Sequence, residues 1–242
     1  MIEKCYNKTY NKALRDGNLK GLLITTNCKE LAMTTANNTR NIERGQSRKP
    51  KLIYGCGFNS KGKYRAAKGG KNTLAYRTWN AMIQRCYCPK FHEKNITYAD
   101  CSVIDDWLDY QNFAEWFYSH PYSEKGYQLD KDLLFPSNRV YSPETCCFVP
   151  QQLNSLLTSS KAARGGYPQG VNLHKPTGNY RAQIRIDNKN HHLGYFDCPN
   201  QAHQAYKAAK ERNVKNMAVK WANRIEWDVF VALMNWRLVE GG

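Results

Sequence analysis

The chain has 242 residues, enough for one large domain or for two small domains that each bury a core, and two domains fit its pattern better. Its 36 Lys and Arg outnumber its 20 Asp and Glu, and the net charge of +16 favours a polyanionic partner, either nucleic acid or an anionic membrane surface. The apolar runs are short and the N-terminus lacks the apolar core of a secretion signal. This pattern argues against a membrane anchor and predicts a soluble, cytoplasmic protein.

Nine cysteines are many for a cytosolic chain, but their odd number and the missing secretion signal argue against a disulfide framework. Four potential metal ligands lie close together in the sequence, and a vicinal pair follows: Cys86, Cys88, His92 and Cys101, then Cys146-Cys147. A structural Zn²⁺ bound by Cys86, Cys101 and one member of the pair is one interpretation. Because the spacing is not the paired CxxC pattern, reduced and buried thiols are the favoured interpretation.

Residues 1–48 contain scattered lysines with little periodicity, which predicts an N-terminal arm or linker that either follows phosphates or docks loosely. From Lys51 onward the pattern predicts a hairpin around Asn59–Gly62 and then two helices. The apolar residues that predict the helices are Tyr76, Trp79, Met82 and Ile83 for the first, and Phe113, Trp116 and Phe117 for the second. We expect these aromatic side chains to form a core.

The stretch 126–157 places acidic and amide side chains around a predicted strand, loop, strand and helix. The first strand ends in Asp130-Lys131-Asp132, the loop carries Asn138, the second strand spans Cys147–Val149, and the helix that begins at Gln151 presents Asn154. Hard cations prefer carboxylate and amide oxygens, so convergence of these groups predicts a magnesium site.

This stretch, with the surrounding residues 51–160, resembles the HNH nuclease finger, particularly the His-Asn-Asn variant of phage homing endonucleases. In that family an Asp-His pair ends the strand, an Asn-Asn-Arg segment occupies the loop, and an Asn on the helix completes the metal site. The resemblance implies that Asp130 and Asn154 bind Mg²⁺ or Mn²⁺ and that Asn138 orients the general base. At the position of the base this chain has Lys131, which is protonated at neutral pH.

Three interpretations of Lys131 are open. Asp132 could replace the histidine as base, with metal-bound water as the nucleophile, or His92 or His120 could supply the base from elsewhere in the chain. In the third interpretation the finger is a non-catalytic DNA-binding relative in which Lys131 contacts a phosphate. The candidate catalytic residues are Asp130, Lys131, Asp132, Asn138 and Asn154.

The stretch 170–210 predicts three antiparallel strands and one helix. Turn residues follow His174 and Ile186, and Tyr180–Ile186 alternates polar with apolar side chains. The alternation directs Ala182, Ile184 and Ile186 toward the helix, whose small residues recur at helical spacing from Pro199 onward. It directs Arg181, Gln183 and Arg185 to the opposite face, in a segment rich in Lys and Arg.

This segment resembles the APETALA/ethylene-response-factor DNA-binding domain. The matching positions are Gly170-Val171, Tyr180 to Arg185, Leu193-Gly194-Tyr195-Phe196 and Ala202 to Tyr206. That family lays its three-stranded sheet in the major groove, and the resemblance implies a sheet that binds double-stranded DNA. The candidate DNA-contacting residues are Asn172, His174, Arg181, Gln183, Arg185, Asn190 and His192.

Together these patterns predict an α+β protein: an N-terminal arm (1–48), an HNH-like ββα finger domain (49–160), and a three-stranded antiparallel sheet packed on one helix, with a terminal helix (161–242). A small, basic linker at 158–166 would let each module find DNA independently. The expected function is that of a phage-type DNA-binding protein, an HNH-family homing-type endonuclease or a degenerate derivative. The alternatives are a non-catalytic regulatory or architectural DNA-binding protein and, third, an RNA-binding module.

Overall fold

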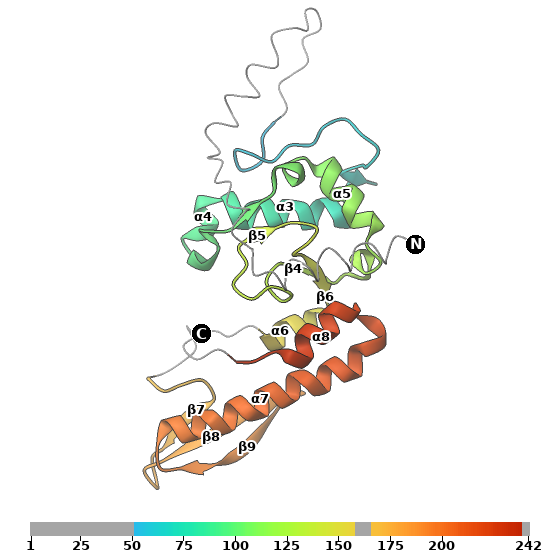
Figure 1. Cartoon of the computed structure of the whole chain (residues 1–242). Coiled ribbons are helices and arrows are strands. Elements are labelled where there is room, and N and C mark those ends of the chain that lie inside the picture. Colours follow the sequence, from blue (N-terminus) through green and yellow to red (C-terminus); the bar gives the residue numbers. More distant parts are fainter. Residues whose placement is uncertain (1–50, 158–165, 239–242) are drawn as a thin grey trace, which may run out of the picture. The chain divides into compact units, whose positions relative to one another are not determined.

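The computed structural model describes residues 51–157 and 166–238 (Figure 1). These residues belong to one compact unit that extends over 50–242. The predicted arm at 1–48 and nearly all of the predicted linker lie outside the described residues. Within the described ranges the fold is α+β, as predicted, with helices and four small sheets. None of the helices in these ranges is both long and apolar enough to cross a membrane.

The first part of the structure is built on two amphipathic helices that pack through aromatic side chains. Its elements are β1 (Ala67–Lys68), β2 (Lys71–Asn72), α3 (Leu74–Tyr87), α4 (Pro89–His92), β3 (Ser102–Val103), α5 (Tyr110–Ser119), and 3-10 turns at Ile96–Tyr98, Asp105–Leu108 and Ser123–Lys125. Thr73 and Asp109 cap the N-termini of α3 and α5 by accepting backbone N–H groups. Trp79, Phe113 and Phe117 are fully buried, which confirms both predicted helices and their core role.

The hairpin predicted around Asn59–Gly62 is wrong. The hairpin in this region is formed by β1 and β2, which meet at Gly69-Gly70, where both residues have positive φ (57° and 74°). Two successive left-handed residues are tolerated best by glycine, so this pair makes the turn. Asn59 instead accepts a hydrogen bond from the Gln111 side chain, which also bonds to the backbone of Tyr64.

The strand, loop, strand and helix predicted in 126–157 are present. They are β4 (Gln128–Asp130), β6 (Cys147–Val149) and α6 (Gln151–Leu157), and the loop between the strands contains β5 (Val140–Tyr141). β4 pairs with β6 in antiparallel register, with Asp130 opposite Cys147. β5 pairs in parallel with β3, which the sequence did not predict.

The three-stranded antiparallel sheet predicted near the carboxyl end is confirmed. It has the order β7 (Val171–His174), β8 (Asn179–Ile186), β9 (Lys189–Phe196), and α7 (Pro199–Trp221) packs on one face (Figure 1). The side chains buried between sheet and helix are Val171, Ala182, Ile184, Ala202, Tyr206 and Ala209. Gly170 has a φ of 79° and lies so close to the Tyr206 ring that a Cβ at this position would overlap it.

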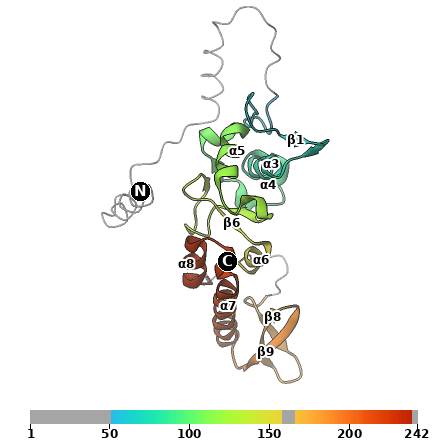
Figure 2. The same cartoon turned by 90° about the vertical axis from the view of Figure 1, so that its right-hand side faces the viewer.

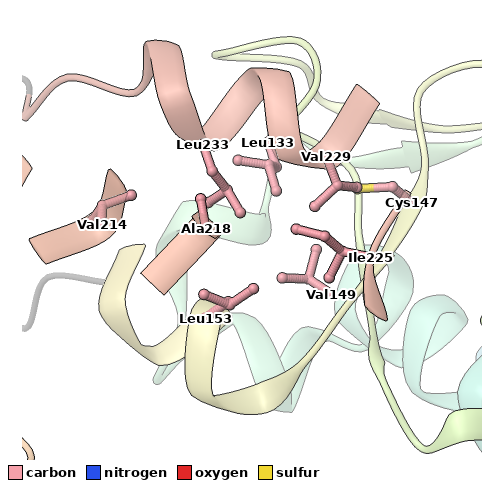
Figure 3. Packing of buried hydrophobic residues seen from close by; sticks show 9 residues of the cluster. All are labelled: Leu133, Cys147, Val149, Leu153, Val214, Ala218, Ile225, Val229 and Leu233. Atoms are coloured by element: carbon pink, nitrogen blue, oxygen red, sulfur yellow. The ribbon is translucent and has the colours of Figure 1, made fainter. Parts of the chain in front are cut away.

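The C-terminal part of α7 and the terminal helix α8 (Trp227–Asn235) pack against α6 and β6 in a second cluster (Figures 2 and 3). Its buried members are Leu133, Cys147, Val149, Leu153, Val214, Ala218, Ile225, Val229 and Leu233. Four of them precede the predicted linker and five follow it. The boundary between the two predicted domains, which falls in undescribed residues, stays a prediction, but hydrophobic packing joins the described segments on both sides of it.

Candidate functional site

The predicted DNA-contacting residues lie on the exposed face of the sheet formed by β7, β8 and β9. Residues directly opposite each other in antiparallel strands share a face. The register pairs Asn172 with Arg181, His174 with Asn179, Gln183 with His192, Arg185 with Asn190, and Arg181 with Tyr195. These nine residues form what we call the polar sheet face, on the side of the sheet away from α7. All seven candidates lie on it, and their role in binding stays a prediction.

Positive charge on this face is not neutralised within the described ranges. Neither Arg181 nor Arg185 forms an ion pair there, and Arg185 is exposed. The Nε of Arg181 is buried and lacks a hydrogen-bond partner among the described residues. The carboxylate of Asp197, which follows β9, accepts a hydrogen bond from the Asn179 side chain (Nδ2 to Oδ1, 3.1 Å) and, in the described part of the chain, forms no ion pair with either arginine. Guanidinium groups without acidic partners remain available to phosphates and base edges.

Two residues of the polar sheet face were missed by the sequence argument, Asn179 and Tyr195. Tyr195 is 51% exposed, and its ring centroid lies 4.8 Å from that of His174 and 4.6 Å from that of His192. Strict alternation from His192 would place Tyr195 on the opposite face. The signal that could have found it is Gly194, since a glycine inside a strand often marks a bulge.

Asp130, the first candidate metal ligand, is used to fix its own loop. Its Oδ1 accepts hydrogen bonds from the backbone N–H of Asp132 (3.0 Å) and of Leu133 (2.8 Å). Burial raises the pKa of the Asp130 carboxyl above its usual range, and the negative charge of Asp132 raises it further. A carboxyl held in this environment favours protonation more than an ordinary aspartate does.

Lys131, at the position where the HNH resemblance implies a histidine, is buried. It is 6% exposed, its Nζ lies 2.8 Å from Oδ2 of Asp132, and the rings of Tyr98 and Tyr141 are each 5.9 Å from it. The Lys131 ammonium therefore occupies one carboxylate oxygen of Asp132. Burial also keeps the Lys131 ammonium from an external phosphate unless the loop rearranges.

Asn138 and Asn154 occupy different parts of this segment. Asn138 donates from Nδ2 to the carbonyl oxygens of Lys131 and Val140, both at 2.7 Å, so it fixes the backbone of position 131. Asn154 donates from Nδ2 to Oε1 of Gln128 at 2.6 Å. Gln128 precedes Asp130 by two strand residues, a displacement of about 7 Å along β4. The Asn154 amide nitrogen is therefore engaged by the Gln128 side chain.

The two histidines considered as substitutes for the base are engaged elsewhere. His92 Nε2 lies 2.7 Å from the carbonyl oxygen of Arg85. His120 Nε2 lies 3.1 Å from Oε1 of Glu226, and its ring packs on Phe148 with centroids 4.8 Å apart. Phe148 and Cys147 point to opposite faces of β6, and Asp130 is opposite Cys147. His120 therefore approaches the face of this ribbon that does not carry Asp130.

The predicted magnesium site, Asp130 with Asn154, stays a prediction. Within 51–157 and 166–238 no group of three or more His, Cys, Asp or Glu side chains is placed to bind a metal ion.

Burial raises the pKa of several cysteine thiols in the described ranges. The pKa of Cys146 rises to about 12, and those of Cys86 and Cys147 also rise, with burial as the main cause in each case. The zinc hypothesis stays a prediction.

No protein-family model, curated protein or solved structure matches this chain.

Proposed function

We propose that this protein binds double-stranded DNA through the polar sheet face, and that its ββα segment is a degenerate derivative of an HNH finger that does not cleave DNA. The observation that carries the proposal is the single-sided arrangement of the sheet. One face is buried under α7, and the other presents arginine, amide, imidazole and phenol groups without acidic partners for the arginines. These are the groups that contact phosphates and base edges.

The dimensions of the sheet suit a duplex groove. Strands in a sheet lie about 4.8 Å apart, so the outer strands β7 and β9 are separated by about 10 Å, against a major-groove width of about 12 Å. The net charge of +16 supplies long-range attraction to a polyanion. The resemblance to the APETALA/ethylene-response-factor domain adds support, because that domain lays its sheet in the major groove.

The ββα segment supports a non-catalytic role. Cleavage needs a base next to the metal site, and the groups that could serve are occupied: Lys131 and Asp132 pair with each other, and His92 and His120 bind elsewhere. The Lys131–Asp132 pair and the Asn138 contacts instead hold the loop between β4 and β6 in one conformation. We infer that the segment keeps the shape of the finger while its chemistry is lost.

The test is salt-dependent binding to a mixed-sequence duplex, measured by fluorescence anisotropy. The full chain should bind, and log Kd should rise linearly with log salt because phosphate contacts release counterions. The double variant Arg181→Ala, Arg185→Ala should bind several-fold more weakly, with the slope reduced by up to about two. The control is Arg77→Ala, Arg212→Ala, which removes the same charge from exposed positions on α3 and α7.

Equal losses in the two double variants would assign binding to overall charge and not to the polar sheet face. Tighter binding to structured RNA than to duplex DNA in competition would favour the RNA-binding alternative.

The second candidate is a metal-dependent endonuclease. Two observations favour it: the raised pKa of Asp130, which is typical of functional carboxylates, and the contact of Asn138 with position 131. Purified protein with Mg²⁺ or Mn²⁺ on supercoiled DNA should show no nicking under the present proposal. Nicking that disappears in both Asp130→Ala and Asn154→Ala would establish the endonuclease and overturn the non-catalytic interpretation.

A further inference from the structure

A β-bulge changes which residues β9 presents on the polar sheet face. Ala182 pairs with Gly194 and Gln183 pairs with His192, so Leu193 is an extra residue on β9. Side chains alternate along a regular strand, and one extra residue reverses the alternation beyond it. His192 and Tyr195 are three residues apart and would face opposite sides of a regular strand. The bulge brings both to the polar sheet face.

The bulge depends on Gly194. This residue has a φ of 137°, which side chains other than hydrogen rarely tolerate, and a Cβ there would lie 3.2 Å from the Phe196 ring. Bulges often re-aim a side chain beside a functional site. Here the re-aimed side chain is an aromatic ring that would otherwise be directed toward α7, where burial is favourable. With the bulge, the Tyr195 side chain is 51% exposed and loses the favourable burial against α7.

Contacts with the two edge strands hold the Tyr195 ring in place. His174 of β7 and His192 of β9 both lie within 5 Å of it between ring centroids, and Nδ1 of His174 lies 2.9 Å from Oγ1 of Thr177. Tyr195 stands opposite Arg181 in the same cross-strand row. A ring fixed in one orientation loses little conformational entropy on binding, as is typical of aromatic contact residues.

We propose that Tyr195 is a specificity-determining residue that packs against the C5-methyl group of a pyrimidine in the major groove. This inference rests on the proposed binding of double-stranded DNA. In a duplex the base faces are stacked and inaccessible, so an aromatic side chain in the major groove meets base edges. The apolar group on those edges is the methyl of thymine, or of 5-methylcytosine where it occurs. The amide, imidazole and guanidinium groups around Tyr195 supply the hydrogen bonds to neighbouring bases.

The experiment first selects a preferred site from a random duplex pool and then replaces each thymine in it by uracil. This change removes the methyl and leaves every hydrogen-bonding group of the base edge in place. We expect wild-type protein to lose about three- to fourfold in affinity at one thymine, the equivalent of one buried methyl group. Tyr195→Ala should bind the thymine and uracil duplexes alike, and Tyr195→Phe, which keeps the ring, should keep the ratio.

The control variant is Tyr118→Ala, which removes an exposed tyrosine from α5 and should keep the wild-type ratio. Exchange of cytosine for 5-methylcytosine tests the second source of the methyl, and a gain in affinity that Tyr195→Ala abolishes also supports the proposal. Duplex binding with no methyl effect at any position, or a methyl effect that persists in Tyr195→Ala, overturns it and leaves the proposed function intact. Failure to bind duplex DNA at all overturns the proposed function first.

Discussion

Leu153 tests whether the segments on the two sides of the undescribed residues 158–165 are held together by one core. Its side chain is fully buried and lies in the cluster that joins α6 and β6 to α7 and α8 (Figure 3). Leu153→Ala removes apolar contacts and leaves a cavity, which costs about 2–5 kcal/mol of unfolding free energy in comparable cores. A chain of this size should then melt roughly 10 °C lower. Leu173→Ala is the control, because Leu173 is 39% exposed and its loss should cost less than about 1 kcal/mol.

The assay is amide hydrogen exchange read by mass spectrometry in mild urea. If the cluster is a shared core, Leu153→Ala should lower protection in β4 and β6 and, by a similar free energy, in the C-terminal part of α7. Wild-type protection in α7 combined with rapid exchange in β4 and β6 would refute this reasoning and show that the two segments are independently stable.

Three further predictions concern single residues. Gly170→Ala should destabilise the protein more than Gly178→Ala in urea unfolding. Both glycines have positive φ (79° and 76°), but a Cβ at position 170 would overlap the Tyr206 ring, whereas one at position 178 would meet nothing within 4 Å. Equal losses of stability would contradict this packing. The raised pKa of Asp130 means that the folded state binds a proton more readily than the unfolded state, so wild-type stability falls as pH rises from the ordinary aspartate pKa through the raised one. Asparagine does not titrate, so Asp130→Asn should gain stability relative to wild type as pH rises. If the difference in urea midpoint between wild type and Asp130→Asn is the same at pH 4.5 and pH 7.5, the raised pKa of Asp130 is contradicted. Iodoacetamide at pH 8 should leave Cys86, Cys146 and Cys147 unmodified in native protein, because burial raises the pKa of these thiols. Mass spectrometry measures the modification, and rapid labelling of these three cysteines would contradict their burial.

The sequence predicted the elements that depend on local patterns. Helical spacing of aromatic residues identified α3 and α5, and the alternation in Tyr180–Ile186 identified both faces of β8. These predictions succeed because the period of side-chain direction is fixed within one element. The turn after Ile186 was also recognised: Asp187 and Asn188, both with positive φ, make a two-residue turn between β8 and β9.

Features that depend on distant residues were not predictable in the same way. The parallel pair β3 and β5 is made of two-residue strands from separate segments, too short to leave a periodic signal. The cluster around Leu153 draws apolar residues from both predicted domains, and nothing in the spacing of either domain identifies its partner. The sequence argument missed the hairpin turn at Gly69-Gly70 and wrongly placed a hairpin at Asn59–Gly62, which also has turn-forming residues.

The candidate catalytic site shows where a motif-based expectation reaches its limit. The motif located Asp130, Asn138 and Asn154 on the expected strand, loop and helix. It could not predict that Asn154 bonds to Gln128 or that Lys131 is buried against Asp132, because both depend on three-dimensional packing. On the polar sheet face, alternation placed the seven candidates but missed Tyr195, since a bulge breaks the very rule used to place them.

The most direct test of the central claim is a titration of ¹⁵N-labelled protein with a short duplex, followed by NMR. Our account predicts that the backbone signals that shift first lie in β7, β8 and β9, with the side chains of His174 and His192 among them, while α3 and α5 remain unchanged. Shifts confined to the loop between β4 and β6 or to α3, with the three-stranded sheet unaffected, would contradict the account.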